Sequence, residues 1–150
     1  MKRRHASPPL LTVLIGMPGS GKTTYAQTHS PPQAIISIDA CWERCYSSTG
    51  GEHLFWELLE TQLSRNTDTV TDRTALDAST RARLLYRGHH HGYAVHAVLL
   101  DTPYSVCVYR DAMRETPFLS AVLRRCYETV TETRGQLLDE GFDRVTILTG

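Results

Sequence analysis

The sequence has no excess of either charge: 16 lysine and arginine residues balance 16 aspartate and glutamate residues in a chain of 150. Because no overall field attracts nucleic acid or an anionic membrane, any site for a polyanion must be a local group of residues. Long apolar runs are also missing, and stretches such as residues 94–100 are far too short to span a bilayer. We therefore expect a cytoplasmic protein without membrane contact.

The N-terminus lacks the apolar segment of a secretory signal peptide, although basic residues occupy positions 2–4. We interpret residues 1–9 as a short basic tail and residues 10–150 as a single domain, since the chain has the length of one ordinary domain. Hydrophobic residues make up 41% of the sequence, which is enough to form a core.

Two cysteine pairs with the spacing of a metal site are absent as well. The four cysteines include only one close pair, at positions 41 and 45, which favours free thiols. Lysine is also scarce: apart from Lys2, the chain has only Lys22, and arginine occupies every other cationic position. The compact ammonium of Lys22 therefore marks a place that a planar guanidinium does not suit.

Strand-like and helix-like segments alternate along the chain. The residues at 94–100 are apolar except for His96, as a strand covered on both faces requires. This alternation predicts an α/β fold, a doubly wound parallel sheet with helices on both faces. We expect strands at 10–15, 34–38, 68–72, 94–100 and 145–148, and helices at 21–28, 53–63, 79–91, 104–114 and 118–133.

The segment GMPGSGKT at 16–23 matches the pattern G-x-x-x-x-G-K-[ST] at every fixed position, between an expected strand and an expected helix. Its glycines let backbone N–H groups turn toward phosphate oxygens, and the helix that follows adds the positive end of its dipole. Lys22 places a charge between the β- and γ-phosphates, and the hydroxyl of Thr23 is a ligand for Mg²⁺. The pattern predicts a nucleoside triphosphate site formed by Gly16, Pro18, Gly19, Ser20, Gly21, Lys22, Thr23 and Thr24.

Four more residues are candidates for the chemistry. Asp39 follows the second expected strand at the ligand-binding edge of the sheet, where it suits a general base, although a helix cap is the alternative. Asp72 ends the third strand beside the P-loop strand, where it can hold Mg²⁺ through water. Arg110 and Arg114 are four residues apart, so we expect them on one helix face, either as a phosphate clamp or as a solvated pair.

The segments GMPGSGKTT, SID, TDRTAL, HGYAVHAVLLDTP, RDAMR and PFLSAVLRR, in this order, resemble the P-loop kinases of the polynucleotide 5′-hydroxyl kinase type, small ATP-dependent kinases of the AAA_33 type. The resemblance covers nearly the whole chain. It implies a five-stranded sheet of order 2-3-1-4-5. It also implies that Asp39 is the general base, that Lys22 and Thr23 bind phosphate and Mg²⁺, and that Arg110 and Arg114 belong to a lid over the ATP phosphates.

Two positions depart from the family. The nucleic-acid kinases carry an arginine three residues after the catalytic aspartate, where this chain has Trp42, and their Asp-x-Thr-Asn is Asp72-Arg73-Thr74-Ala75 here. We expect a Mg²⁺-dependent kinase that uses ATP or GTP to phosphorylate a hydroxyl group, with the 5′-hydroxyl of a polynucleotide as the first choice. Trp42 and the zero net charge favour a small sugar, nucleoside or antibiotic instead. A nucleotide-binding regulatory protein without an acceptor is the third possibility, and it would not need Asp39.

Overall fold

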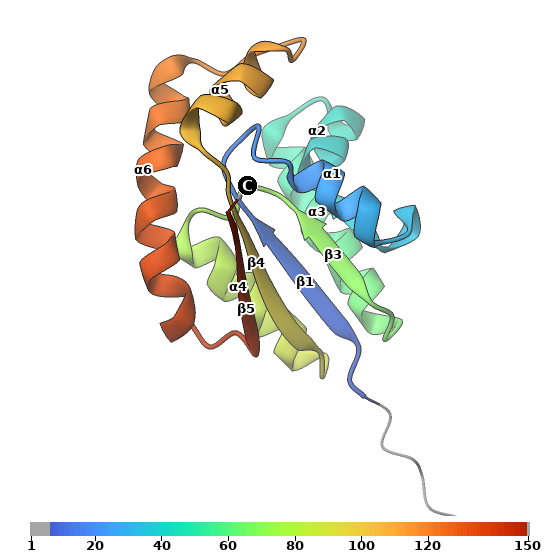
Figure 1. The fold of residues 1–150 in the computed structure, drawn as a ribbon. Helices are drawn as coiled ribbons and strands as arrows, with labels where there is room; N and C mark the ends of the chain where they lie inside the picture. The colour runs from blue at the N-terminus through green and yellow to red at the C-terminus, as the bar shows by residue number, and fades with distance from the viewer. Residues whose placement is uncertain (1–6, 150) are drawn as a thin grey trace, which may run out of the picture.

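Five parallel strands form the centre of the structure, a computed structural model that describes residues 7–149 (Figure 1). The spatial order is β2-β3-β1-β4-β5, and each neighbouring pair is parallel. The fold class and the strand order are both confirmed. Most of the expected basic tail, residues 1–6, lies outside the described residues, so the domain boundary at residue 10 stays a prediction. The strands are β1 (Leu10–Ile15), β2 (Ile35–Ser37), β3 (Thr69–Asp72), β4 (Ala94–Asp101) and β5 (Arg144–Thr149).

Helices cover both faces of this sheet (Figure 1). Helix α1 packs on one face, and α3, α4 and α6 pack on the other. No helix within residues 7–149 is long and apolar enough to cross a membrane. The helices are α1 (Lys22–His29), α2 (Ile38–Cys45), α3 (Ser48–Ser64), α4 (Ala78–His90), α5 (Tyr104–Ala112) and α6 (Ser120–Gln136), with short 3₁₀ turns at η1 (Pro32–Ala34) and η2 (Leu137–Asp139).

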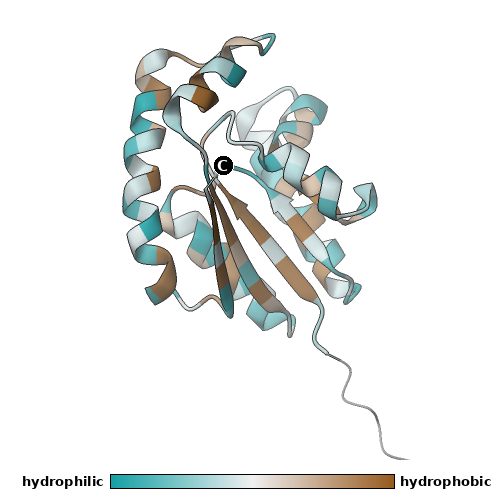
Figure 2. Cartoon of the chain, viewed as in Figure 1, coloured by the Kyte–Doolittle hydropathy of each residue, from teal (hydrophilic) through white to brown (hydrophobic). Residues whose placement is uncertain are grey.

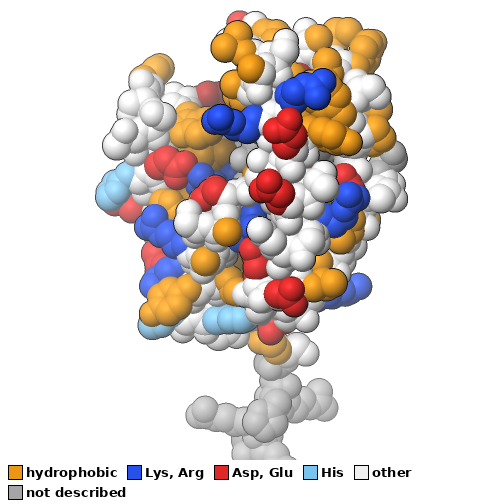
Figure 3. All heavy atoms as spheres, turned by 90° about the vertical axis from the view of Figure 1, so that its left-hand side faces the viewer, with side chains coloured by type: hydrophobic (Ala, Val, Ile, Leu, Met, Phe, Trp, Pro, Cys, Tyr) orange, Lys and Arg blue, Asp and Glu red, His pale blue; other side chains and the backbone are white. Residues whose placement is uncertain are grey.

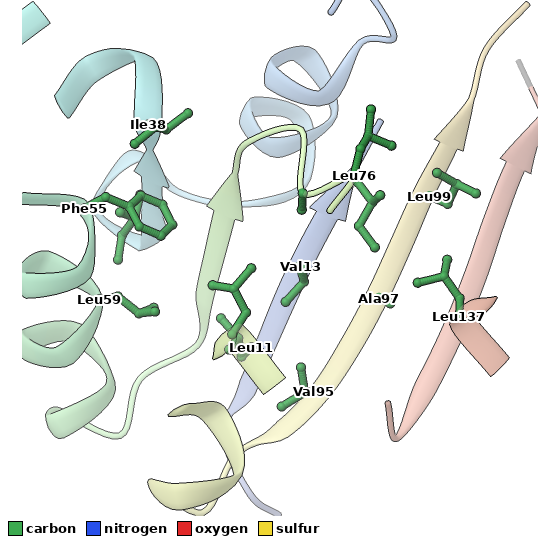
Figure 4. Close-up of a cluster of buried hydrophobic side chains, with 14 of the residues drawn as sticks. Leu11, Val13, Ile38, Phe55, Leu59, Leu76, Val95, Ala97, Leu99 and Leu137 are labelled. Atoms are coloured by element: carbon green, nitrogen blue, oxygen red, sulfur yellow. The ribbon is translucent and has the colours of Figure 1, made fainter. Parts of the chain in front are cut away.

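The core lies on both sides of β1 and β4, which explains why these strands are apolar along nearly their whole length (Figure 2). Leu14 and Val98 point to α1, together with Leu100. The strand side chains that point to the other face of the sheet fill the larger cluster under α3, α4 and α6 (Figure 4). The fully buried members of that cluster in β1 and β4 are Leu11, Val13, Ile15, Val95, Ala97 and Leu99.

The region around β2 differs from the expectation. The sequence predicts a strand over 34–38, but the strand ends at Ser37 and α2 begins at Ile38. The hydroxyl of Ser37 accepts a hydrogen bond of 3.3 Å from the N–H of Ala40, which is an N-cap that ends the strand and starts the helix. Asp39 therefore lies in the first turn of a helix instead of at the end of a strand.

Helix α5 is shorter than expected. It ends at Ala112, so the prediction that Arg110 and Arg114 share one helix face is wrong. The buried carboxylate of Asp111 accepts a hydrogen bond of 2.9 Å from the N–H of Phe118, which folds the chain back toward α5. Pro117 also disfavours helical geometry in the residue before it. Arg114 consequently lies in the connection between α5 and α6.

The contact between α2 and α3 gives a test of the packing. A methyl group on Gly51 of α3 would lie 2.2 Å from Cδ1 of Trp42 and 2.8 Å from its Cα. We expect Gly51→Ala to lower the free energy of unfolding by about 1–3 kcal/mol, the usual cost of overpacking. Gly135→Ala in α6 is the matched control, because nothing lies within 4 Å of its added methyl group. That variant should gain about 0.5–1 kcal/mol from helix propensity. Urea unfolding measures both, and an unchanged Gly51→Ala would contradict the close packing.

Candidate active site

The loop between β1 and α1 has a backbone that only glycine adopts readily. Gly19 and Gly21 have φ angles of +81° and +99°, in the left-handed region. A Cβ atom on Gly19 would lie 2.5 Å from the carbonyl oxygen of Cys107, so this position also has no space for a side chain. The two glycines thus set the path of the loop, as the sequence pattern predicts.

Hydrogen bonds from two neighbouring strand ends hold the loop in place. The N–H of Gly16 donates to the carbonyl of Thr74, after β3, at 3.0 Å. The hydroxyl of Thr102, after β4, donates to the carbonyl of Ser20 at 2.7 Å. Both contacts come from the carboxyl edge of the sheet, which is where ligands bind in folds of this kind.

Lys22 is buried inside the loop. Its Nζ donates to the carbonyl oxygens of Gly16 and Met17, at 2.9 and 3.1 Å. Burial lowers the pKa of Lys22, while the carboxylates of Asp72 and Asp39 act in the opposite direction. An ammonium held by neutral carbonyls in a buried place would gain a strong partner if an anion entered the loop.

The N-terminus of α1 provides further donors for an anion. The helix begins at Lys22 with Gly21 as its N-cap, without a side-chain cap and without an acidic residue in the first turn. The backbone N–H groups and the positive end of the dipole therefore face the loop without a carboxylate from the first turn of the helix itself. In addition, the hydroxyl oxygen of Ser20 is buried and has no hydrogen-bond partner within the described chain. Such an orphaned group is typical of a ligand site.

Thr23 and Asp72 meet at one side of the loop, as the sequence predicts for a metal site. The hydroxyl of Thr23 donates to Oδ2 of Asp72 at 2.8 Å. Burial raises the pKa of Asp72, and the hydrogen bond from Thr23 and the charge of Lys22 oppose this rise. A hydroxyl and a carboxylate are oxygen ligands that suit Mg²⁺. No group of three metal-ligating side chains occurs in residues 7–149.

One cleft of about 1020 Å³ contains nearly all of the predicted site residues. Gly16 is the exception: it is buried and does not line the cleft. Asp39 is exposed in the wall formed by α2. The predicted residues that line the cleft are Pro18, Gly19, Ser20, Gly21, Lys22, Thr23, Thr24, Asp39, Asp72, Arg110 and Arg114.

The two arginines take different places in the cleft. Nη1 of Arg110 donates to the carbonyl of Gly19 at 3.3 Å, so this guanidinium already lies over the loop. Arg114 lies farther out, where its guanidinium stacks 4.8 Å from the ring centre of Phe118 and Nε is 3.9 Å from Oδ1 of Asp111. Only Arg110 is therefore in direct contact with the loop in this structure.

Several residues that line the cleft are not predicted from the sequence. Phe118 and Cys126 come from the start and the middle of the α6 region, where no motif identifies them. Thr102 follows β4 directly, and the rule that ligands bind at the carboxyl ends of parallel strands is a signal that identifies it. Arg73 lines the cleft in a bidentate ion pair with Glu52, which lies 21 residues earlier in the chain.

The comparison with known families gives a clear assignment. A model of the AAA_33 family, described as an AAA domain, matches residues 11–133. The chain belongs to the AAA_33 family. A relative of this AAA_33 domain is the protein named transcription factor bHLH140 from Arabidopsis thaliana, which is 29% identical over 111 residues. The match covers 70% of this chain but 12% of the plant protein, so the domain corresponds to only a small part of that relative.

Solved structures share the fold of this AAA_33 domain. A chain from the Pnkp1/Rnl/Hen1 RNA repair complex superposes with a TM-score of 0.73 at 16% identity, covering 91% of this chain and 48% of that one. A gluconokinase from Sinorhizobium meliloti 1021 superposes with a TM-score of 0.62 at 20% identity, covering 96% of this chain and 84% of that one. At these identities the likeness shows the fold alone, whereas the expected membership of the AAA_33 type is confirmed by the family model.

Lys22 gives the first test of the site. Lys22→Ala should weaken the binding of MgATP about tenfold or more, because the loop loses the charge opposite the phosphates. Lys22→Arg should not restore binding, since a planar guanidinium does not fit a place shaped for an ammonium. Titration calorimetry measures the affinity, and circular dichroism checks the fold. Wild-type affinity in a folded Lys22→Ala variant would exclude the loop as the nucleotide site.

Proposed function

We propose that this protein is a Mg²⁺-dependent kinase that transfers the γ-phosphoryl group of ATP or GTP to a hydroxyl group of a second substrate. One observation carries the proposal: the P-loop, the Thr23–Asp72 pair and the exposed carboxylate of Asp39 line the same cleft. The AAA_33 assignment and the fold shared with a gluconokinase support it.

The donor half of the cleft holds the triphosphate. Lys22 exchanges the carbonyls of Gly16 and Met17 for phosphate oxygens, and the N–H groups at the start of α1 bind the same phosphates. Thr23 and Asp72 would hold Mg²⁺, directly or through water. The ion, when bound, neutralises and orients the β- and γ-phosphates.

Asp39 is the proposed general base. The acceptor hydroxyl gives its proton to this carboxylate while its oxygen forms a bond to the γ-phosphorus. The bond between that phosphorus and the bridging oxygen breaks at the same time, and the nucleoside diphosphate leaves. An exposed carboxylate in the first turn of α2 is free to accept this proton, since no side chain or backbone group within the described residues forms a hydrogen bond with it.

Arg110 and Arg114 are proposed to bind the negative charge that the transferring group carries. Arg110 already lies beside the loop at Gly19, so a small change of rotamer brings it to a phosphate. Arg114 has to move with the connection between α5 and α6, as lid residues do when substrates bind. Guanidinium groups suit this role because they form paired hydrogen bonds with phosphate oxygens.

Two kinds of acceptor remain for this proposed kinase. The 5′-hydroxyl of a polynucleotide is the first choice from the sequence, and the fold shared with a chain of an RNA repair complex supports it. A small molecule with a hydroxyl group, such as a sugar, nucleoside or antibiotic, is the second, and Trp42 favours it, because this cleft-lining residue replaces the arginine of the nucleic-acid kinases. Figure 3 also shows Lys and Arg side chains interspersed with Asp and Glu on the α6 side, without a continuous basic surface.

Asp39→Asn tests the general base. We expect kcat to fall by roughly 10²- to 10⁴-fold with little change in the affinity for ATP, because the amide keeps the shape but does not accept the proton. The measurement is acceptor-stimulated release of ADP, over a panel of 5′-hydroxyl oligonucleotides and small hydroxyl compounds. Glu43→Gln is the matched control, since it removes an exposed carboxylate of the same helix outside the cleft. A regulatory protein without an acceptor would show no stimulation at all.

The arginines give an independent test. Arg110→Ala and Arg114→Ala should each lower kcat by about 10²-fold or more, and lower it by a larger factor than they raise KM for ATP. Arg114→Lys should stay well below wild type if its contact is bidentate. Arg125→Ala removes an exposed arginine of α6 outside the cleft and is the control. If both folded alanine variants stay within about twofold of wild type, the two arginines are ordinary surface residues and the proposed lid is wrong.

A further inference from the structure

We call the part of the cleft around Asp39, Trp42 and Arg73 its acceptor half. Arg73 is the one lysine or arginine among the described residues that line this half, and Glu52 neutralises its charge. Among the lysine and arginine residues that line the cleft, Lys22, Arg110 and Arg114 lie on the donor side. Arg73 donates from Nη1 and Nη2 to the two carboxylate oxygens of Glu52, at 3.0 and 2.6 Å. A bidentate pair of this kind satisfies both terminal nitrogens of the guanidinium.

Aromatic rings of α3 fix this ion pair in position. The guanidinium carbon of Arg73 lies 4.7 Å from the ring centre of Phe55 and 5.8 Å from that of Trp56. The Arg73 side chain is only 12% exposed, whereas that of Glu52 is 39% exposed. An anionic group that approached Arg73 would therefore meet the carboxylate of Glu52. If the group displaced Glu52 from Arg73, the carboxylate of Glu52 would lose its partner.

Trp42 forms a rigid apolar wall beside the proposed base. It lies three residues after Asp39 on α2, so both side chains share one face of the helix. Its ring packs against Gly51, where even a methyl group would come within 2.2 Å of Cδ1. The indole is still 36% exposed and lines the cleft. A fixed ring next to carboxylates suits a ligand that has an apolar face and several hydroxyl groups.

Asp39 is the one carboxylate that lines this side of the cleft within the described residues, and Arg73 is already paired with Glu52. Glu52 does not line the cleft itself, but its pair with Arg73 offsets the charge of the guanidinium that does. A carboxylate or phosphate on the acceptor therefore finds no unpaired cation here and meets the carboxylate of Asp39, which is an acceptor for hydroxyl groups.

We propose, on the basis of the proposed kinase function, that the acceptor is an uncharged polyhydroxyl compound of the size of a sugar or polyol. In this arrangement it lies against Trp42, and the Glu52–Arg73 pair selects against anionic acceptors. Glu52 and Arg73 are thus specificity residues for a hydroxyl group that Asp39 deprotonates.

The test compares acceptors that differ in charge. D-glucose is paired with gluconate and glucuronate, ribitol with ribonate, and a 5′-hydroxyl oligonucleotide is included as the nucleic-acid acceptor. Transfer of label from γ-labelled ATP gives kcat/KM for each. The wild-type protein should prefer the uncharged member of a pair about tenfold or more, a difference of roughly 1.4 kcal/mol in the free energy of activation.

Glu52→Gln tests the role of the ion pair, because it keeps the size of the side chain and removes its charge. With Arg73 no longer neutralised, the ratio of kcat/KM for anionic over uncharged acceptors should rise about tenfold or more. Glu60→Gln is the matched control: Glu60 lies two turns further along α3 and pairs with Arg87 and His91 outside the cleft. It should leave the ratio unchanged.

Trp42→Ala keeps the proposal testable if Glu52→Gln does not fold. It should raise KM for uncharged acceptors about tenfold while the affinity for ATP stays the same. The inference is overturned if the wild-type protein prefers anionic acceptors or the oligonucleotide, if it phosphorylates no uncharged acceptor, or if Glu52→Gln leaves the ratio unchanged. Failure of the kinase function itself looks different, because no acceptor of any class would then take up the label.

Discussion

The site depends on one interaction, the hydrogen bonding of the buried ammonium of Lys22 inside the loop. Nζ lies between two loop carbonyls, at 2.9 and 3.1 Å, and burial lowers its pKa. The carboxylates of Asp72 and Asp39 offset this effect in part, but the hydrogen bonds of the ammonium go to neutral oxygens, and such a desolvated cation gains from an anion that joins it. The loop tolerates it because Gly19 and Gly21 adopt left-handed geometry and because Thr74 and Thr102 fix the loop from both neighbouring strand ends. The loop is thus anchored at the carboxyl edge of the sheet.

The two sides of the cleft have different physical characters. The donor side is built from backbone N–H groups and from cations, as any triphosphate site of this fold requires. On the proposed acceptor side, Trp42 of α2 forms an aromatic wall, and Arg73, which follows β3, is neutralised by Glu52 of α3. We infer that the family fold determines the donor chemistry, whereas the side chains of α2 and α3 determine which hydroxyl group is accepted.

Local signals in the sequence predict the sheet and the loop well, because the apolar run of a strand and the glycines of the loop each lie within a few consecutive residues. The start of α2 was missed since the cap of Ser37 on Ala40 ends a strand whose last residues are still apolar. The early end of α5 depends on Asp111 reaching Phe118. The partnership of Arg73 with Glu52 joins residues 21 positions apart, and no periodicity predicts it. Long-range polar contacts of this kind require the fold itself.

A crystal structure with Mg²⁺ and a non-hydrolysable ATP analogue tests the central claim most directly. The account predicts that Nζ of Lys22 leaves the carbonyls of Gly16 and Met17 and binds the β- and γ-phosphates, with Mg²⁺ between Thr23 and Asp72. Arg110 should move from the carbonyl of Gly19 to a phosphate oxygen. A nucleotide bound elsewhere, or bound while Lys22 stays on the two carbonyls, would contradict the account.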